Sequence, residues 1–133
     1  MKYLLIITLF TCLLSCKKTD TTPTPAGDAN VQSQLFNINN SDWSYVNNVY
    51  SYTLYTSLIT DNVLNTGAVQ LYITQDGVNY IALPFTEYPA AGSLSFNYEA
   101  KTGQIAIYAD ANYTQTASPG AVTFKVVVID DIL

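Results

Sequence analysis

Residues 93–109 read SLSFNYEAKTGQIAIYA and decide the fold class. From Leu94 to Tyr98 apolar side chains alternate with polar ones, which is the period of a strand with one buried face and one solvated face. Residues 101–103 predict a turn of three to five residues whose glycine takes the left-handed conformation. A second strand is then expected over residues 104–109. The stretch therefore predicts an antiparallel hairpin.

The same alternation runs through the chain from Val31 onward, interrupted every eight to twelve residues by Gly, Pro, Asn or Asp. This pattern is typical of an all-β protein, and its length favours a single immunoglobulin-like antiparallel β-sandwich of about seven to eight strands. Closure into a barrel is the alternative that one sequence leaves open. We expect strands over 32–38, 43–48, 49–58, 68–75, 78–84, 93–99, 104–109 and 121–129, where the second and third can form one bent strand.

Turn residues add a second local prediction. Asp76-Gly77 lies between two strand-like runs, and this dipeptide accepts the positive backbone dihedrals of a type I′ turn. We therefore expect a two-residue hairpin there. Helical spacing is not sustained anywhere after the first sixteen residues, so the sequence predicts no helix in the domain.

The chain begins as a secretory signal. Lys2 precedes an apolar run from Leu4 to Leu14, which is followed by Ser15 and Cys16. An apolar helix of this length rises only about 16 Å, roughly half of the hydrocarbon thickness of a bilayer, so we expect a cleaved segment and not a membrane span. An ordinary signal peptide with an incidental cysteine is the less specific alternative.

The string Leu13-Leu14-Ser15-Cys16 resembles the bacterial lipobox. The resemblance implies that residues 1–15 are removed as a lipoprotein signal peptide and that Cys16 is lipidated, which anchors the protein to a membrane through its N-terminus. Lys17 in place of Asp implies the outer membrane. The run Lys17-Lys18-Thr19-Asp20 lacks the acidic stretch of many surface-exported lipoproteins, so the periplasmic and the extracellular face both stay open.

Residues 16–30 follow as a tether. From residue 17 they read KKTDTTPTPAGDAN, without one large apolar side chain, and such a segment buries too little surface to fold by itself. Its prolines favour extended conformations, so the tether is expected to hold the domain away from the lipid. The organisation predicted is signal peptide 1–15, lipidated tether 16–30 and β-sandwich domain 31–133.

Several short motifs carry a wider resemblance across the domain. These are Asp42-Trp43, Ile59-Thr60-Asp61 leading to Gly67-Ala68-Val69, Leu83-Pro84-Phe85-Thr86, and the closing strand FKVVVI over 124–129. With the lipobox and the tether they make the chain similar to small lipoproteins of Bacteroidota that carry one β-sandwich. That resemblance implies a place in the cell envelope and supplies no catalytic residue or ligand.

Composition argues against most catalytic chemistry. The chain of 133 residues has five Lys, no Arg and no His against ten acidic residues, a formal charge of −5 that disfavours nucleic-acid binding. Without imidazole, the remaining economical active site is a pair of carboxylates. Glu87 and Glu99 are the only glutamates, and both are expected to be solvated surface charges. We therefore predict no enzymatic activity and no cofactor.

Calcium is the inorganic partner that this composition best suits, because it needs only oxygen ligands. Asp61-Asn62, Asp110 with Asn112, and Asp130-Asp131 could supply them, but turns also prefer Asp and Asn, so no metal is assigned.

Aromatic residues offer a possible binding patch. Tyr55, Tyr72 and Tyr108 fall out of phase with the apolar sets of their strands, and Trp43 is a weaker candidate. Packing of these rings inside the sandwich is the alternative. The leading hypothesis is a non-enzymatic, lipid-anchored envelope lipoprotein that presents a protein- or glycan-binding β-sandwich. A carbohydrate-binding accessory lipoprotein would need the three tyrosines to be exposed and coplanar, and a structural or self-assembling component would use an exposed strand edge.

Overall fold

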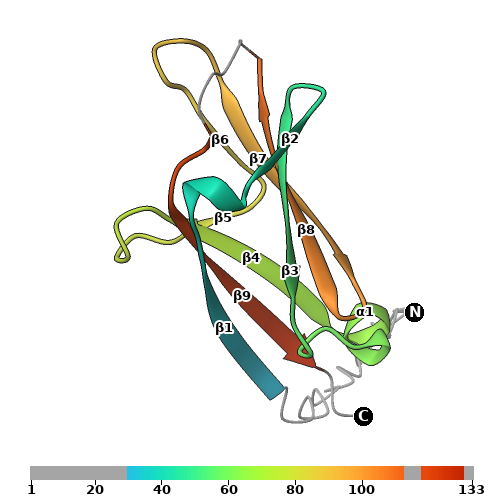
Figure 1. The fold of residues 1–133 in the computed structure, drawn as a ribbon. Helices are drawn as coiled ribbons and strands as arrows, with labels where there is room; N and C mark the ends of the chain where they lie inside the picture. Colours follow the sequence, from blue (N-terminus) through green and yellow to red (C-terminus); the bar gives the residue numbers. More distant parts are fainter. Residues whose placement is uncertain (1–29, 113–117, 131–133) are drawn as a thin grey trace, which may run out of the picture.

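The computed structural model describes residues 30–112 and 118–130, so the predicted signal peptide, Cys16 and all but the last residue of the predicted tether lie outside the described residues. The described chain forms nine strands and two short helices (Figure 1). The helices are η1 (Asn40–Asp42) and α1 (Asp61–Thr66). The strands are β1 (Asn30–Ile38), β2 (Ser44–Val46), β3 (Val49–Tyr55), β4 (Ala68–Thr74), β5 (Ile81–Ala82), β6 (Phe85–Glu87), β7 (Leu94–Lys101), β8 (Gln104–Ala111) and β9 (Val122–Asp130).

Two antiparallel sheets pack face to face, which confirms the predicted all-β sandwich. Sheet A has the strand order β1-β9-β4-β5, and sheet B has the order β2-β3-β8-β7-β6. The protein thus shares the two-sheet architecture of immunoglobulin-like sandwiches. Its strand order differs from theirs, since its first and last long strands, β1 and β9, are neighbours in one sheet. Their register is unbroken from Asn30 opposite Asp130 to Ile38 opposite Val122.

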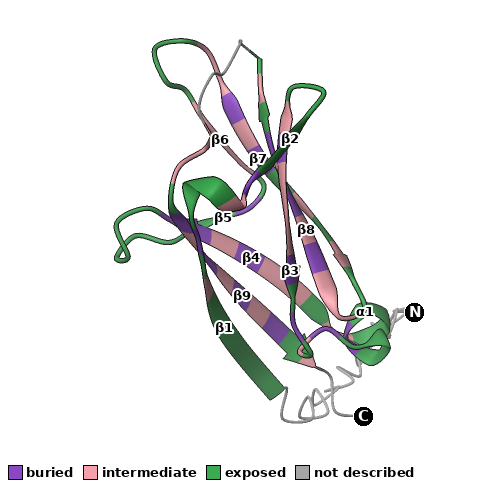
Figure 2. Cartoon of the chain, in the orientation of Figure 1, coloured by how far each residue is buried: buried purple, intermediate pink, exposed green. Residues whose placement is uncertain are grey.

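The core follows from the alternation read in the sequence. Along β8, Ile105, Ile107 and Ala109 are fully buried, and the residues between them face outward. β9 buries every second residue in the same way (Figure 2). Each fully buried large apolar side chain contributes about 1.5–3 kcal/mol relative to an exposed one. The inner faces of the two sheets supply the largest of them: Leu54, Leu71, Phe96, Ile105, Ile107, Phe124 and Val126.

The tight turns differ from prediction in position and in length. Val46 pairs with Val49, and the two residues between them, Asn47 and Asn48, both have positive φ (52° and 65°), as a type I′ turn requires. Thus 43–48 and 49–58 are two paired strands and not one bent strand. The loop over Thr102-Gly103 has two residues, shorter than expected, although Gly103 takes the predicted positive φ of 76°.

The predicted two-residue hairpin at Asp76-Gly77 is wrong. Ile73 pairs with Ile81, so the connection spans residues 74–80, and only Gly77 of the pair has a positive φ. The reason is that the Asp76 carboxylate accepts hydrogen bonds from the backbone N–H groups of Val78 and Asn79 at 2.9 and 2.8 Å, which closes a wider loop. The strand expected over 78–84 shrinks to β5, and the chain then crosses to sheet B as β6.

The expectation of no helix is wrong at α1. Thr60 caps this helix by accepting a hydrogen bond from the Val63 N–H at 3.2 Å, and Gly67 ends it. Six residues are too few to establish a helical period, so only the cap signalled the helix. No helix within the described ranges is long and apolar enough to cross a bilayer.

Candidate functional site

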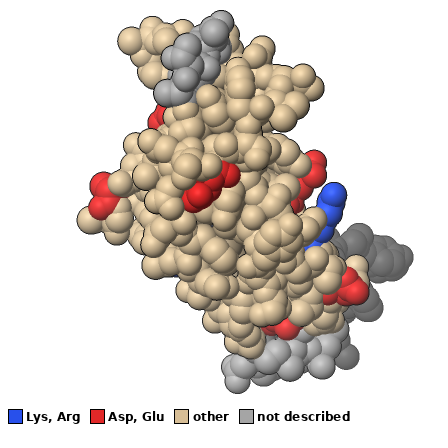
Figure 3. All heavy atoms as spheres, viewed as in Figure 1, with Lys and Arg blue, Asp and Glu red and all other residues tan. Residues whose placement is uncertain are grey.

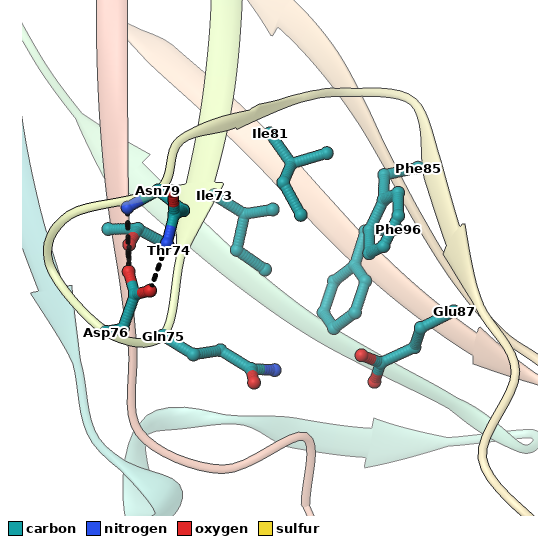
Figure 4. Close-up of a pocket in the computed structure, with 9 residues that line it drawn as sticks. All are labelled: Ile73, Thr74, Gln75, Asp76, Asn79, Ile81, Phe85, Glu87 and Phe96. Carbon is teal, nitrogen blue, oxygen red and sulfur yellow. Dashed lines mark hydrogen bonds between the residues drawn. The ribbon is translucent and has the colours of Figure 1, made fainter.

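A pocket opens at the seam between the two sheets, where the chain crosses from β5 to β6 (Figure 4). Its volume is about 230 Å³. Sheet A contributes β4 and β5, sheet B contributes β6 and β7, and the loop after β4 closes one side. The lining residues are Ile73, Thr74, Gln75, Asp76, Asn79, Ile81, Phe85, Glu87 and Phe96.

The floor of the pocket is apolar and belongs to the core. Phe96 and Ile73 are 1% and 3% exposed, and Phe85 stands directly opposite Phe96 in the pairing of β6 with β7. Ile81 is 43% exposed and lies at the rim. Buried neighbours on both sheets hold the floor in place, so the pocket is a formed feature of the sandwich, where an apolar group would be removed from water.

One side of the pocket is a loop fixed by its own aspartate. The Asp76 carboxylate accepts from the backbone N–H groups of Val78 and Asn79, from the Asn79 side-chain amide at 2.6 Å and from the Thr74 hydroxyl at 3.0 Å. These hydrogen bonds, those from the Asn79 and Val78 backbone foremost, hold the pKa of the Asp76 carboxyl far below its usual range. In Figure 4 this carboxylate turns toward Asn79 and Thr74, away from Glu87.

The Glu87 carboxylate is the ionisable group that faces the pocket space. Glu87 pairs with the buried Leu94, so it lies on the inward side of β6 and is only partly exposed. The expectation that it is a solvated surface charge is therefore wrong, because the loop predicted there is a strand. Figure 4 shows the Gln75 amide extending toward the same space from the opposite wall. Together they place a carboxylate and an amide over an apolar floor.

Glu99 does not join this site. It lies on the outward side of β7, as the alternation predicted, and the Tyr108 hydroxyl is 3.4 Å from its carboxylate. Glu87 and Glu99 thus occupy opposite faces of sheet B, so the two glutamates do not converge as a glycosidase pair would require.

The prediction that Trp43 belongs to a binding patch is wrong. It is 8% exposed, its indole N–H donates to the Gly120 carbonyl oxygen at 3.1 Å, and its ring packs edge to face with Tyr52 and Phe124. Trp43 is therefore a core residue whose indole N–H is hydrogen-bonded, as is usual for a buried tryptophan.

The three tyrosines predicted as a patch do not form one surface. Tyr55 is 73% exposed on β3, and Tyr108 on the neighbouring β8 is partly exposed on the same outer face of sheet B. Tyr72 alternates with the buried Leu71 and Ile73 and lies on the outer face of sheet A. The body of the sandwich therefore separates Tyr72 from the other two.

Of the residues considered for calcium, Asp61, Asn112 and Asp130 accept structural hydrogen bonds, whereas Asp131 lies outside the described residues. Asp61 accepts from the Thr102 hydroxyl, Asp130 accepts from the Asn62 amide at 2.8 Å, and Asn112 accepts from the Ser93 N–H at 2.8 Å. Within residues 30–112 and 118–130 no three His, Cys, Asp or Glu residues gather as a metal site would need. On the face shown in Figure 3 acidic side chains lie apart from one another.

No family model, curated protein or solved structure matches this chain.

The pocket was not visible to sequence reasoning, since its walls come from four strands and a loop. The alternating pattern identified Phe96 only as a core residue, and Phe85 appeared only in a short motif. The one usable signal was Asp76-Gly77-Val78-Asn79, in which an aspartate precedes backbone donors that it can accept from, as in an Asx turn.

Proposed function

We propose that this protein is a non-enzymatic, lipid-anchored lipoprotein of the bacterial cell envelope, in the outer membrane, that binds a protein segment through the pocket between its sheets. The lipobox-like string ending at Cys16 and the Thr/Pro-rich tether support the anchor. The short motifs that resemble those of small Bacteroidota lipoproteins point to the same location. The pocket is the single observation that carries the binding role.

The size and chemistry of the pocket favour one side chain of a protein partner. At about 230 Å³ it is smaller than the pockets that enclose whole cofactors or drug-sized ligands. An apolar floor under a polar rim is how interfaces seat an anchor residue. The Glu87 carboxylate beside that floor and a net charge of −5 favour a basic neighbour on the partner. The proposed ligand is thus an apolar side chain next to Lys or Arg.

Access to the pocket is compatible with the tether. Thr74 on the pocket wall pairs with Thr123, and Thr123 pairs with Asn37 of β1. Asn37 lies seven residues along β1 from Asn30, where the described domain begins. At about 3.3 Å per residue the pocket wall and the start of the domain are roughly 23 Å apart. The described chain therefore begins at the end of sheet A away from the pocket wall.

The catalytic and glycan-binding alternatives have less support. Asp76 is occupied by four hydrogen bonds, which leaves Glu87 without a second free carboxylate in the pocket. The carbohydrate-binding hypothesis requires Tyr55, Tyr72 and Tyr108 to lie on one plane. Tyr55 and Tyr108 lie on the outer face of sheet B, whereas Tyr72 lies on the outer face of sheet A.

Short synthetic peptides test the pocket. The probes are acetyl-Gly-Ser-Leu-Lys-Ser-Gly-amide and the same peptide with Glu for Lys, titrated into the full chain in detergent by calorimetry. Ile81→Trp should block binding by filling the mouth, and Glu87→Gln should weaken the Lys peptide about two- to fivefold, the range of a partly exposed ion pair. Val78→Trp is the matched control, because Val78 is 78% exposed on the same loop outside the pocket.

Equal affinity for the two peptides, or binding that survives Ile81→Trp, would contradict the proposed ligand. Binding of a defined oligosaccharide that Tyr55→Ala abolishes would favour the glycan reading. Protease shaving of intact cells, with a periplasmic protein as the intactness control, decides which face of the outer membrane carries the domain. Cleavage would direct the search for the partner to extracellular proteins, and protection would direct it to periplasmic ones.

A further inference from the structure

β1 is an unprotected sheet edge. The other three edge strands of the two sheets, β2, β5 and β6, have only three, two and three residues, which is a usual means of blunting an edge. β1 has nine residues, and seven of them are exposed (Figures 1 and 2). Among the described residues no strand pairs with its outer side.

None of the devices that normally protect a long edge is present in β1. Its sequence, NVQSQLFNI, contains no charged residue and no proline, and its register with β9 continues without a bulge. The backbone donors and acceptors along its outer side are therefore free to pair with another extended strand.

The side chains of β1 sort into two uncharged rows. On the outer face of sheet A stand Val31, Ser33 and Leu35, with Val31 and Leu35 61% and 57% exposed. On the opposite face stand Gln32 and Gln34, which are also exposed residues, and the Gln34 amide oxygen accepts a hydrogen bond from the Thr56 hydroxyl at 3.0 Å. Val31 and Leu35 thus flank Ser33 on the outer face, and Gln32 and Gln34 flank it on the opposite face.

We propose that β1 pairs antiparallel with β1 of a second copy of this chain, with Ser33 opposite Ser33 on a two-fold axis. In this register each Val31 lies opposite Leu35 of the second copy, and each Gln32 lies opposite Gln34. Directly opposed apolar pairs and amide pairs both stabilise antiparallel strands. Shifting the pairing by one in-phase step places Val31 opposite Asn37 and Leu35 opposite Ser33, which loses both apolar matches.

The dimer joins two four-stranded sheets into one eight-stranded sheet with an isologous interface. The apolar row of each copy continues across the axis, because Val31 already lies beside Ile129, itself 40% exposed. The two Asn30 residues are then six residues apart, about 20 Å. The fourteen residues from 17 to 30 extend to at most about 50 Å, so both proposed lipid anchors reach one membrane.

Disulfide trapping tests the register. Ser33→Cys in the full chain, in its own membrane, is oxidised with copper phenanthroline and analysed on a non-reducing gel, with the unsubstituted chain as the baseline. Directly opposite residues of antiparallel strands have Cα atoms about 4.5–5.5 Å apart, within the range that a disulfide spans. We expect a covalent dimer as the main product.

Asn37→Cys is the matched control, because it is exposed on the same strand and the same face. In the proposed register the two copies of residue 37 are about 27 Å apart, so this variant should stay monomeric. No dimer from Ser33→Cys, cross-linking to a different protein instead, or equal cross-linking at both positions would each overturn the proposal.

Like charges on the edge provide the second test. Adding Val31→Lys and Leu35→Lys to Ser33→Cys sets Lys opposite Lys twice, and we expect at least a tenfold loss of trapped dimer. Tyr55→Lys with Val78→Lys is the control, since these side chains are even more exposed and lie on β3 and on the loop after β4. A dimer that survives the β1 lysines while thermal unfolding is unchanged would overturn the proposal.

Discussion

Trp43 offers the sharpest test of the packing, because the sequence suggested a binding residue and the structure buries it. Trp43→Ala removes an 8% exposed indole, two edge-to-face ring contacts at 6.4 and 6.3 Å, and the donor to Gly120. Core Trp→Ala substitutions cost about 3–5 kcal/mol, and the partly buried Gly120 carbonyl also loses its donor. We expect about 4 kcal/mol. For a domain of about 100 residues this lowers Tm by something on the order of 15–30 °C.

The assay is thermal and urea unfolding of the full chain in detergent, followed by circular dichroism, because the substitution removes the only Trp of the chain. Trp43→Phe retains a packed ring and loses the N–H donor, so we expect about 1–2 kcal/mol. Tyr55→Ala is the control, and at 73% exposure it should stay within about 0.5 kcal/mol of the parent. A Trp43→Ala variant as stable as Tyr55→Ala would refute the burial of this indole between the sheets.

Three further outcomes are expected. Gly67→Ala should destabilise by about 1–3 kcal/mol in the same unfolding assay, because the new Cβ would overlap the Ile129 carbonyl oxygen and lie 3.0 Å from that of Val63; an unchanged urea midpoint would contradict this close approach. Asp76→Asn should lower Tm at pH 7, and the difference from the parent should shrink as the pH falls below about 4, since a carboxyl with a depressed pKa stabilises the fold fully above its unfolded value and loses that contribution progressively towards its folded value; a pH-independent difference would be inconsistent with that origin. Cys16→Ser should move the protein from the membrane to the soluble fraction and abolish metabolic labelling with an alkyne fatty acid, because several acyl chains at about 0.8 kcal/mol per methylene form the proposed anchor; a labelled Cys16→Ser variant would place the lipid elsewhere.

Period-two alternation predicted most of the sandwich because it records burial directly. The long strands β8 and β9 bury every second side chain along most of their length, and β4 and β7 do so over part of theirs, so their sequences alternate. Prediction was weaker where backbone hydrogen bonds to side chains decide the path. The Asp76 carboxylate widens a loop that its dipeptide alone predicts as a two-residue turn, and Thr60 starts a helix too short to show a period.

The prediction of the binding patch was wrong for a related reason. Phase along a strand distinguishes the two faces of one sheet, but it does not tell which sheet the strand joins. Tyr72 and Tyr108 are both out of phase with their apolar neighbours, and they face outward from different sheets. Glu87 was assigned to solvent because the Pro-bounded segment read as a loop, whereas its pairing with Leu94 turns the carboxylate toward the pocket.

The proposed dimer and the proposed pocket constrain one another through symmetry. A two-fold axis between antiparallel strands of one sheet is perpendicular to that sheet. In each copy, Asn37, Thr123 and Thr74 form one row of paired residues, which lies four residues along β1 from Ser33. Because the two β1 strands run in opposite directions, the two pocket walls are about 27 Å apart along the strands. A partner with repeated anchor segments can engage both pockets at once, and its avidity would fall when the β1 lysines dissociate the dimer although each pocket keeps its own affinity.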